Sequence, residues 1–286
     1  MLSERHDPRG RVLRHHRTGT EVRRIGYPIC IRTGRLLRRE QVTKNIVRLT
    51  VGGPELAGFH TYQADDHVKI VFPDADGTRR LPVPTPDLSL DWPKPSPPSR
   101  RYTIRRYDAD ACEIDFDFVL HPGGLASAWA AEAQPGEDVS IAGPPGAKAF
   151  PHNYDHYVFA VDATALPAAA RWLEESPPDV SAHLVVETAD AADHAYPLAA
   201  RDGVEVTWLV RDGGRSPLAD AVLSLDLPDR RTFLFAAGET GAIKPLRAWA
   251  RDRKAVGGEA AGGEGAGGMD ALFTGYWKVG VADLED

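Results

Sequence analysis

The sequence is poor in cysteine and has no long apolar run. Cys30 and Cys112 are the only two thiols in 286 residues. Two thiols do not ligate an iron–sulfur cluster on their own, and a structural disulfide is not expected in a reducing compartment. No stretch approaches the roughly 20 apolar residues of a membrane span, and no apolar segment follows the early arginines as in a signal peptide. We therefore expect a cytoplasmic protein without stable membrane insertion, in which both cysteines are small buried side chains.

The sequence also lacks the usual spacing of metal ligands and the charge of a nucleic-acid-binding protein. His60, His67 and His121 have no acid or cysteine partner at ligand spacing, so we predict no protein-bound metal. The net charge is −7, and residues 1–28 hold seven arginines against three acids, which leaves −11 on the remainder. An acidic body argues against nucleic-acid binding. Segment 1–28 has no aromatic residues between its arginines, and we expect a flexible basic arm.

Residues 29–150 contain short runs of alternating apolar and polar residues, bounded by Gly, Pro and Asp. Strands are predicted at 42–51, 67–73, 100–108 and 113–121. One helix is expected at 124–133, and a strand returns within 134–146. Seven prolines in 81–100 indicate an extended loop. This pattern predicts a small antiparallel β-barrel.

Residues 151–286 alternate continuous apolar runs with helical segments. The apolar runs are 156–161, 182–188, 204–210, 232–238 and 270–280. Such alternation predicts βα units and a parallel sheet, which binds ligands at the carboxyl ends of its strands. Segment 257–268 is expected to be a flexible Gly-rich linker. The predicted fold class is therefore β followed by α/β.

The segment RRYTIRRYD (100–108) contains four arginines and two tyrosines. Arg100 offers a planar cation for a phosphate or pyrophosphate, and Tyr102 offers an aromatic face for a flat ring. Thr103 adds a hydroxyl and a backbone amide for a ring heteroatom. The alternative is an arginine-rich edge strand that its charge protects from aggregation.

The segment HPGGLASAWA (121–130) places two glycines and small residues at the start of a predicted helix. The free backbone N–H groups of its first turn, at Leu125, Ala126 and Ser127, form a site for an anion. With the Arg-x-Tyr-Thr strand before it, this helix start supplies partners for the ring, ribitol and diphosphate of a flavin dinucleotide. The alternative is an ordinary glycine-led helix start.

From residue 30 onward the chain resembles the siderophore-interacting protein family, FAD-containing ferric-siderophore reductases related to ferredoxin–NADP reductases. The resemblance is carried by the two segments above and by ADDHVKIVFP (64–73), VDATALPAAARWLE (161–174), FAAGETGAIKPLR (235–247) and FTGYWKVG (273–280). Gly-Tyr-Trp followed by a basic residue is characteristic of that family. The resemblance implies a β-barrel that binds FAD, an α/β domain that binds NAD(P)H, and a cleft between them for the iron chelate.

The resemblance also implies roles for individual residues in the first domain. The flavin and its phosphates would be held by Arg100, Tyr102, Thr103, Arg105, His121, Gly124, Ala126 and Ser127. Trp129 would either support the dinucleotide or pack its helix.

In the second domain, the resemblance places a nicotinamide nucleotide after the first strand. The family has Asp-Glu-Thr there, and Ala163 replaces the glutamate in this chain, which leaves Asp162 and Thr164. The alternative is a strand-to-helix turn with Thr164 as N-cap. The segment AGETGA (237–242) opens a helix at another strand end.

The segment AGETGA (237–242) contains three candidates for the nicotinamide side: Gly238, Glu239 and Thr240. Glu187 also ends a strand, and it would favour NADH over NADPH if it accepted a hydrogen bond from a ribose hydroxyl.

The expected substrate is a ferric siderophore, which is often anionic, so a cationic cleft in an acidic body would attract it. The family is thought to use a small basic cluster. Matching motifs nominates Lys69, Arg251 and Lys278 for it, with Arg247, one helical turn from Arg251, as an alternative.

The resulting hypothesis is an FAD-dependent oxidoreductase that passes electrons from NADH or NADPH through the flavin to a ferric siderophore and releases Fe(II). It requires no acid, base or nucleophile from the protein. The alternatives are a flavin or quinone reductase on the same scaffold and a non-catalytic siderophore carrier. We expect a monomer, since no exposed heptad or apolar stripe is evident in the sequence.

Overall fold

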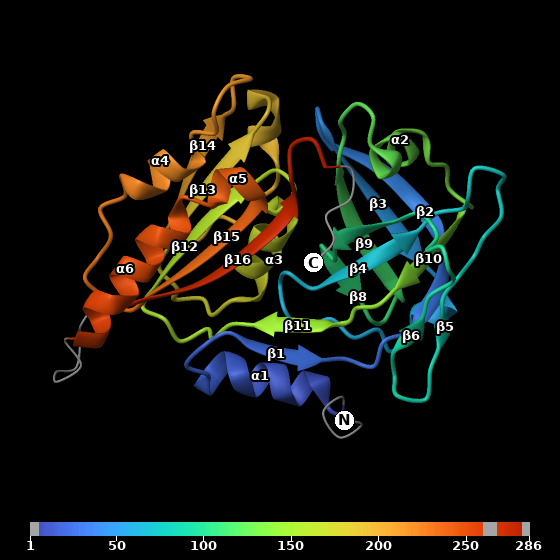
Figure 1. Cartoon of the computed structure of the whole chain (residues 1–286), viewed down its shortest axis with the longest axis horizontal. Helices are drawn as coiled ribbons and strands as arrows, with labels where there is room; N and C mark the ends of the chain where they lie inside the picture. The colour runs from blue at the N-terminus through green and yellow to red at the C-terminus, as the bar shows by residue number, and fades with distance from the viewer. Residues whose placement is uncertain (1–5, 260–267, 282–286) are drawn as a thin grey trace. The chain divides into compact units, whose positions relative to one another are not determined.

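The chain forms two compact units in a computed structural model that describes residues 6–259 and 268–281. Unit 1 comprises the described residues up to His16 together with Arg23–Ala149. Unit 2 comprises Arg17–Val22 together with the described residues from Phe150 onward. Each unit has its own sheet (Figure 1) and its own core.

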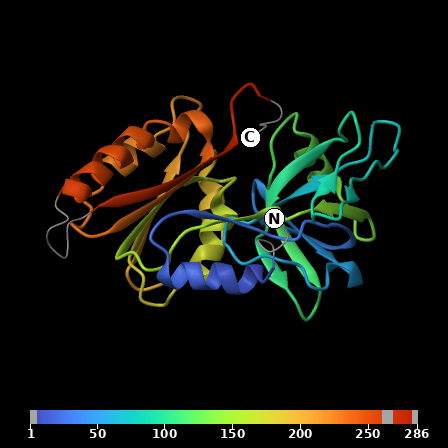
Figure 2. The ribbon, with the colours of Figure 1, turned by 60° about the horizontal axis from the view of Figure 1, so that its bottom comes forward.

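The N-terminal segment forms regular structure, so the prediction of a flexible arm over 1–28 is wrong for its described residues. It consists of helix α1 (Pro8–Thr18) and strand β1 (Arg23–Gly26), which pairs antiparallel with β11 (Gly146–Ala149). Figure 2 shows α1 from its side, in dark blue. A small buried cluster holds β1: Val12, Ile25, Tyr27, Ala147 and Ala149. The sequence signal is weak because only a narrow stripe of a basic helix is buried.

The main sheet of unit 1 has seven strands, and every neighbouring pair is antiparallel. In spatial order the strands are β7 (Ser99–Thr103), β4 (His67–Val71), β10 (Asp138–Ala142), β2 (Ile31–Thr43), β3 (Ile46–Gly52), β9 (Glu113–Val119) and β8 (Arg106–Asp108). The two edge strands, β7 and β8, are separated in the chain only by Ile104 and Arg105. The sheet must therefore curl so that its edges approach each other, and its antiparallel pairing agrees with the prediction.

Two of the predicted strands are interrupted. The run 42–51 contains the turn at Lys44 and Asn45 that joins β2 to β3, and the run 100–108 is divided between β7 and β8. Lys44 and Asn45 are polar, and Ile104 and Arg105 are one apolar and one polar residue, so neither two-residue break disturbs the alternation that predicted a continuous strand. Within the predicted loop 81–100, β5 (Val83–Pro84) and β6 (Leu90–Asp91) form a short two-stranded ribbon. The remaining elements of unit 1 are η2 (Pro54–Leu56) and α2 (Leu125–Glu132).

Strand β9 has the predicted two faces. Ile114, Phe116 and Phe118 are fully buried in the core of the sheet. On the other face, Asp117 forms a bidentate ion pair with Arg48, at 2.6 and 2.8 Å. Both faces of this strand are therefore covered, one by apolar and one by ionic contacts. Cys30 and Cys112 are free and half-buried, not fully buried as expected.

Unit 2 contains the predicted parallel sheet, with five strands in the order β14-β13-β12-β15-β16. The strands are β12 (His156–Asp162), β13 (Ala182–Thr188), β14 (Val204–Val210), β15 (Thr232–Glu239) and β16 (Met269–Trp277). The connecting elements are α3 (Leu166–Glu175), η3 (Ala191–Ala195), α4 (Leu218–Leu223), α5 (Thr240–Ile243) and α6 (Leu246–Glu259).

Helices cover both faces of this sheet (Figure 1). On one face, Trp172 of α3 packs against Tyr157 and Phe159 of β12. On the other, α4, α5 and α6 bury Val158 and Leu234 among their own apolar residues. The edge strand β14 is largely exposed, although its apolar sequence suggested a buried strand.

Helix α6 extends into the predicted linker. Residues 257–259 are helical, and residues 260–267 lie outside the described ranges. None of the helices in those ranges combines the length and the apolar character needed to cross a bilayer.

Candidate cofactor and substrate sites

Arg100 and Tyr102 lie on the edge strand β7 and face the same side as core residues. Tyr102 is opposite Val68 on β4, and Arg100 is opposite Ile70. The Tyr102 ring packs on Phe118, with ring centroids 4.0 Å apart. Burial raises the pKa of the Tyr102 phenol above its ordinary value.

Lys69, a predicted substrate residue, faces the other side of the same strand pair. It is in register with Arg101, and cross-strand partners share a face. Because successive residues of a strand point to opposite faces, Lys69 and Tyr102 lie on opposite sides of the β4–β7 pair. The Lys69 ammonium is 5.0 Å from the ring centroid of Trp92, within cation–π range.

Thr103 and Arg105 are buried where the chain passes from β7 to β8. The backbone N–H of Arg105 donates to the carbonyl of Asp115 at 2.9 Å. These two predicted cofactor residues are thus enclosed by unit 1, whereas Arg100 and Tyr102 are partly exposed.

Helix α2 begins where the glycine motif predicts, with Gly124 as its N-cap. Glycine has no side chain to cap the helix, so the N–H groups of the first turn are left for another partner. The Ser127 hydroxyl accepts from the His121 N–H at 2.7 Å and donates to the His121 carbonyl at 2.8 Å, which closes the preceding turn. A Cβ at Gly124 would overlap the exposed His121 ring, so an alanine there would require that ring to turn away.

Trp129 packs its helix, which is one of the two roles considered for it. Its ring lies edge-on to Phe72 and Phe118, with centroids 5.5 and 5.6 Å apart. Its indole N–H donates to Glu137 at 3.1 Å. Phe118 therefore contacts both Trp129 of α2 and Tyr102 of β7, and links the two predicted parts of the flavin site.

The residues of this region fit a flavin dinucleotide by their chemistry. Tyr102 supplies an aromatic ring, Arg100 supplies a planar cation, and the first turn of α2 supplies N–H donors without a side-chain cap. These are the partners that an isoalloxazine ring and a diphosphate require.

In unit 2, Asp162 ends strand β12 and is almost completely buried. Its Oδ1 accepts from the N–H and hydroxyl of Thr164, at 2.9 and 2.5 Å. Its Oδ2 accepts from the N–H of Glu239 and the indole N–H of Trp277, both at 2.7 Å. Burial raises the pKa of Asp162, and these hydrogen bonds oppose that rise. Thr164 does not cap α3, whose N-cap is Ala165.

Gly238 and Glu239 end the neighbouring strand β15. Gly238 has φ +142°, and a Cβ there would overlap the Asp162 carboxylate. Glu239 caps α5 by accepting from the Ala242 N–H at 2.7 Å, and its other oxygen accepts from the Val279 N–H at 3.3 Å.

The Thr240 hydroxyl donates to the carbonyl of Trp277 at 3.0 Å. The structure therefore brings Asp162, Thr164, Gly238, Glu239 and Thr240 together at the carboxyl ends of β12 and β15, where Trp277 of β16 contacts them.

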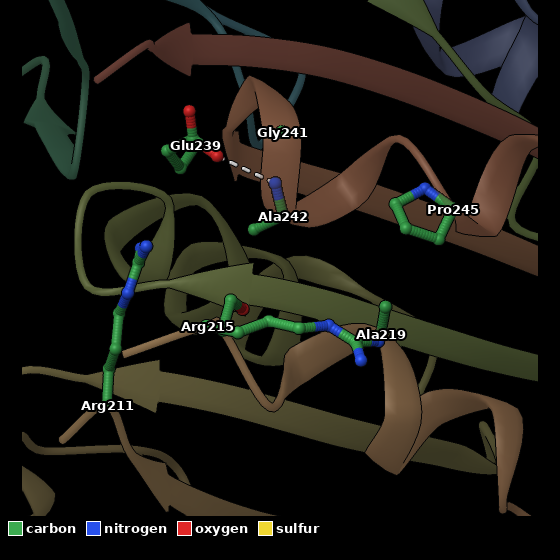
Figure 3. A pocket seen from close by; sticks show the side chains of 8 residues that line it. Arg211, Arg215, Ala219, Glu239, Gly241, Ala242 and Pro245 are labelled. Atoms are coloured by element: carbon green, nitrogen blue, oxygen red, sulfur yellow. Dashed lines mark hydrogen bonds between the residues drawn. The ribbon is translucent and has the colours of Figure 1, made fainter. Parts of the chain in front are cut away.

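A cavity of about 170 Å³ lies at the same edge of the sheet (Figure 3). Its lining residues are Arg211, Arg215, Ser216, Ala219, Glu239, Gly241, Ala242 and Pro245. Of these, the sequence reasoning identified only Glu239. A usable signal was present, since RDGGRS directly follows a predicted strand and puts two arginines at its carboxyl end.

Three of the four predicted substrate residues belong to unit 2. Arg247 and Arg251 are exposed on α6, and the Arg247 guanidinium lies 4.6 Å from the Phe273 ring centroid. Lys278 is exposed directly after β16. Lys69 belongs to unit 1. Within the described residues, no three His, Cys, Asp or Glu side chains gather as metal ligands would.

Models of two family domains match the chain. Residues 35–148 match a siderophore-interacting FAD-binding domain, and residues 154–280 match a siderophore-interacting protein domain. The chain belongs to the siderophore-interacting protein family. The resemblance inferred from the sequence motifs is thereby confirmed, and unit 1 contains the FAD-binding domain of this family.

Characterised relatives include two reductases. This chain is 36% identical over 218 residues to the NADPH-dependent ferric-chelate reductase of Escherichia coli. The matched region covers 74% of this chain and 83% of the relative. It is 34% identical over 241 residues to the ferric vibriobactin reductase ViuB of Vibrio cholerae, covering 81% and 86%.

Solved structures agree with the fold. A siderophore utilization protein from T. fusca superposes with a TM-score of 0.81 at 37% identity, over 93% of this chain and 99% of that one. The ferredoxin-NADP+ reductase of Plasmodium falciparum has a TM-score of 0.56 at 9% identity, over 85% and 96%. The latter likeness establishes a ferredoxin-reductase-like fold and nothing more.

Proposed function

We propose that this protein is an FAD-dependent oxidoreductase that passes electrons from a nicotinamide nucleotide to a ferric siderophore and releases Fe(II). The observation that carries the proposal is the match of the FAD-binding family domain to unit 1, where Arg100, Tyr102 and the uncapped start of α2 fit that cofactor. The named activities of the two reductase relatives support the same reaction.

Bound FAD supplies hydride acceptance from the nicotinamide and release of electrons one at a time to Fe(III). Unit 1 would bind and orient the cofactor: Tyr102 would present a ring that Phe118 fixes, and the backbone N–H groups after Gly124 would hold the diphosphate. Asp162 fixes the ends of β12, β15 and β16, where we place the nicotinamide. Reduction loosens the metal because oxygen chelators bind Fe(III) much more tightly than Fe(II).

For the substrate we propose the cationic side chains Lys69, Arg247, Arg251 and Lys278. All four carry a charge opposite to that of an anionic ferric siderophore, on a chain with net charge −7. Lys69 acts from the face that carries Arg101 and Trp92. We further propose that the protein works as a monomer in the cytoplasm, which size-exclusion chromatography and cell fractionation test.

The test is an anaerobic assay of FAD-loaded protein with NADPH or NADH and a ferric chelate, in which a coloured ligand traps Fe(II). We expect Fe(II) to form at a rate that depends on both the nucleotide and the protein. Equal rates with free flavin or quinones as acceptors would favour a general flavin reductase instead. Protein that stays colourless with FAD, yet binds ferric chelate, would overturn the proposal in favour of a carrier.

The substrate assignment has its own variants. Lys278→Ala should raise the KM for an anionic ferric chelate several-fold, about the loss expected for one charge-assisted contact, and leave kcat unchanged. Lys244→Ala is the matched control, because Lys244 is also an exposed lysine of unit 2. An unchanged KM in Lys278→Ala, Lys69→Ala and Arg251→Ala would remove the proposed substrate site.

A further inference from the structure

We infer that one face of helix α1 and its flanking strand binds the surface of an anionic lipid bilayer. This basic face consists of Arg9, Leu13 and Arg14 of α1 and Arg23 of β1, all of which are exposed and belong to unit 1. The contact is peripheral, with lipid phosphates against the arginines and no helix crossing the bilayer. It is independent of the proposed reaction.

The packing of α1 separates a buried side from an exposed side. The buried residues recur every four positions and therefore share one side of the helix: Pro8, Val12 and His16. Arg9 and Leu13 follow the first two of these at the same spacing, and they share the exposed side with Arg14. Two cations and an apolar side chain thus face away from the core of the unit.

Arg23 lies on the side of the β1–β11 ribbon that α1 covers. Val12 of α1 packs with Ile25 and Ala147, which are cross-strand partners. Arg23 is two residues before Ile25, so it points to the same side, whereas Arg24 points to the opposite side. Because Arg23 is exposed, it adds a third cation to the side on which the helix lies.

Helix α1 is anchored to unit 1 at both ends. The Nε2 atom of the buried His16 is 2.7 Å from Oε1 of the fully buried Gln63. At the start of the helix, the Asp7 carboxylate accepts from the Gly10 N–H at 3.0 Å and caps the first turn. The arginines are therefore presented on an ordered element, which lowers the entropy cost of binding.

The charge of α1 is unbalanced in a way that favours an anionic partner. The helix contains no aspartate or glutamate, so no ion pair within it offsets the repulsion among its arginines. Arg9 is in the first turn, where a positive charge opposes the helix dipole. Residues 6–28 hold six arginines against Asp7 and Glu21, on a chain whose net charge is −7. An anionic surface would relieve this repulsion.

The side chains of the basic face favour lipid over nucleic acid. Leu13 is 40% exposed, and it can enter the boundary between headgroups and acyl chains while the neighbouring guanidinium groups reach the phosphates. Proteins bind single-stranded nucleic acids by aromatic stacking, and α1 contains no Phe, Tyr or Trp. The acidic remainder of the chain also disfavours a long polyanion. The partner that fits is thus a bilayer with anionic headgroups.

The test is co-sedimentation of the FAD-loaded full chain with vesicles. The probes are vesicles of phosphatidylcholine alone and of phosphatidylcholine mixed with phosphatidylglycerol. We expect binding only to the mixed vesicles, and binding that weakens as the salt concentration rises, because the arginines contact headgroup charges. Arg9→Gln and Arg14→Gln should each lower the partition coefficient by about fivefold, the share of one basic residue near the surface. Leu13→Gln should lower it without changing its salt dependence, because the lost contribution is apolar.

Arg24→Gln is the matched control, because it removes the same charge from β1 on the side of the ribbon opposite to α1. It should change the partition coefficient by less than about twofold. Thermal unfolding of each variant verifies that it folds. Fe(II) production without vesicles should be unchanged in all of these variants.

Equal binding to neutral and mixed vesicles, or binding to neither, would overturn the inference. So would Arg24→Gln if it weakened binding as much as Arg9→Gln, since binding would then follow net charge alone. Tighter binding to a double-stranded oligonucleotide than to the mixed vesicles would overturn it in favour of a nucleic-acid surface. The two proposals fail separately: lost Fe(II) production with preserved vesicle binding contradicts only the proposed reaction, and the reverse result contradicts only the basic face.

Discussion

Asp162 is the residue on which the nucleotide end of unit 2 depends. Its carboxylate is buried, and it accepts four hydrogen bonds from Thr164, Glu239 and Trp277. These four donors use both oxygens fully, as expected for a buried carboxylate. Asp162 therefore acts as a positioning residue that joins three strand ends, and a ribose hydroxyl would have to displace one of its donors.

Trp277→Phe tests this role. The substitution keeps an aromatic ring but removes the indole N–H that Asp162 Oδ2 accepts. The loss of a hydrogen bond to a buried charge costs roughly 1–3 kcal/mol, which corresponds to a fall in Tm of about 2–12 °C for the unit. Differential scanning calorimetry measures it, together with the KM for NADPH, which should rise.

Trp208→Phe is the control for this substitution. Trp208 is a half-buried tryptophan of the same unit, stacked on His194, and its indole N–H finds no partner among the described residues. Equal falls in Tm for the two variants would mean that the Asp162 bond contributes nothing beyond ring packing.

At the scale of elements, the parallel strands of unit 2 are the most predictable part of the chain. Strands β13 and β14 match the predicted runs 182–188 and 204–210 residue for residue. The apolar run of β13 leaves few alternatives to a buried strand, and β14 has the predicted bounds although it is largely exposed. The predictions failed where a short break separates two alternating strands, as at 44–45 and 104–105, because a break of two residues preserves the alternating period.

The site was predictable only where a local motif carries it. Arg100, Tyr102 and Gly124 occur in recognisable short segments, and the structure links their elements through Phe118. By contrast, the engagement of Glu187 with Ser216 joins residues that are 29 positions apart. No pattern in one sequence fixes such a pairing, because it depends on how the loop after β14 returns to the sheet.

The start of α2 supplies a prediction for flavin binding. Gly124→Ala adds a Cβ that must push the His121 ring away from the helix start. We expect FAD affinity, followed by absorbance titration of the apoprotein, to fall by up to about tenfold, because the displaced ring alters the loop that precedes α2. His121 is itself a predicted cofactor residue, so His121→Ala is measured alone as the reference, and Gly124→Ala should cost no further affinity in that background. A further loss of affinity in the double variant would show that the steric account is wrong.

At the scale of the whole molecule, the two units carry buried groups with opposite responses to pH. In unit 1, burial and the neighbouring Asp66 raise the pKa of Asp65 to about 7 from 3.8, and Lys148 lowers it in part. The folded state binds this proton more tightly than the unfolded state does. Stability from this group is therefore full below about pH 4 and declines as the pH rises to about 7.

In unit 2, His156 behaves in the opposite way. Burial, His183 and Arg230 lower its pKa to about 4 from 6.5, and Glu205 opposes that shift. Its ring bonds Ser181 at 2.8 Å and His183 at 3.0 Å. The unfolded state binds this proton more tightly, so stability from this group is full above about pH 6.5 and declines as the pH falls to about 4.

Calorimetry across this pH range tests the pair. Because each unit has its own core, we expect two unfolding transitions. Asp65→Asn should raise the midpoint of one transition more at about pH 8 than at about pH 5. His156→Gln should reduce the fall in the midpoint temperature of the other transition between about pH 6.5 and pH 4, whatever the effect of the substitution at neutral pH. A pH-independent shift in both variants would exclude these two groups as sources of the pH dependence.

The exposed edge strand β14 has a practical consequence for anyone who concentrates or crystallises this protein. One side of β14 pairs with β13, and its exposed residues include the apolar Val206 and Val210. Such an edge is a template on which a second polypeptide can add a strand. Precipitation during purification would begin there, and a single lysine in place of Val206 would act as a gatekeeper against it.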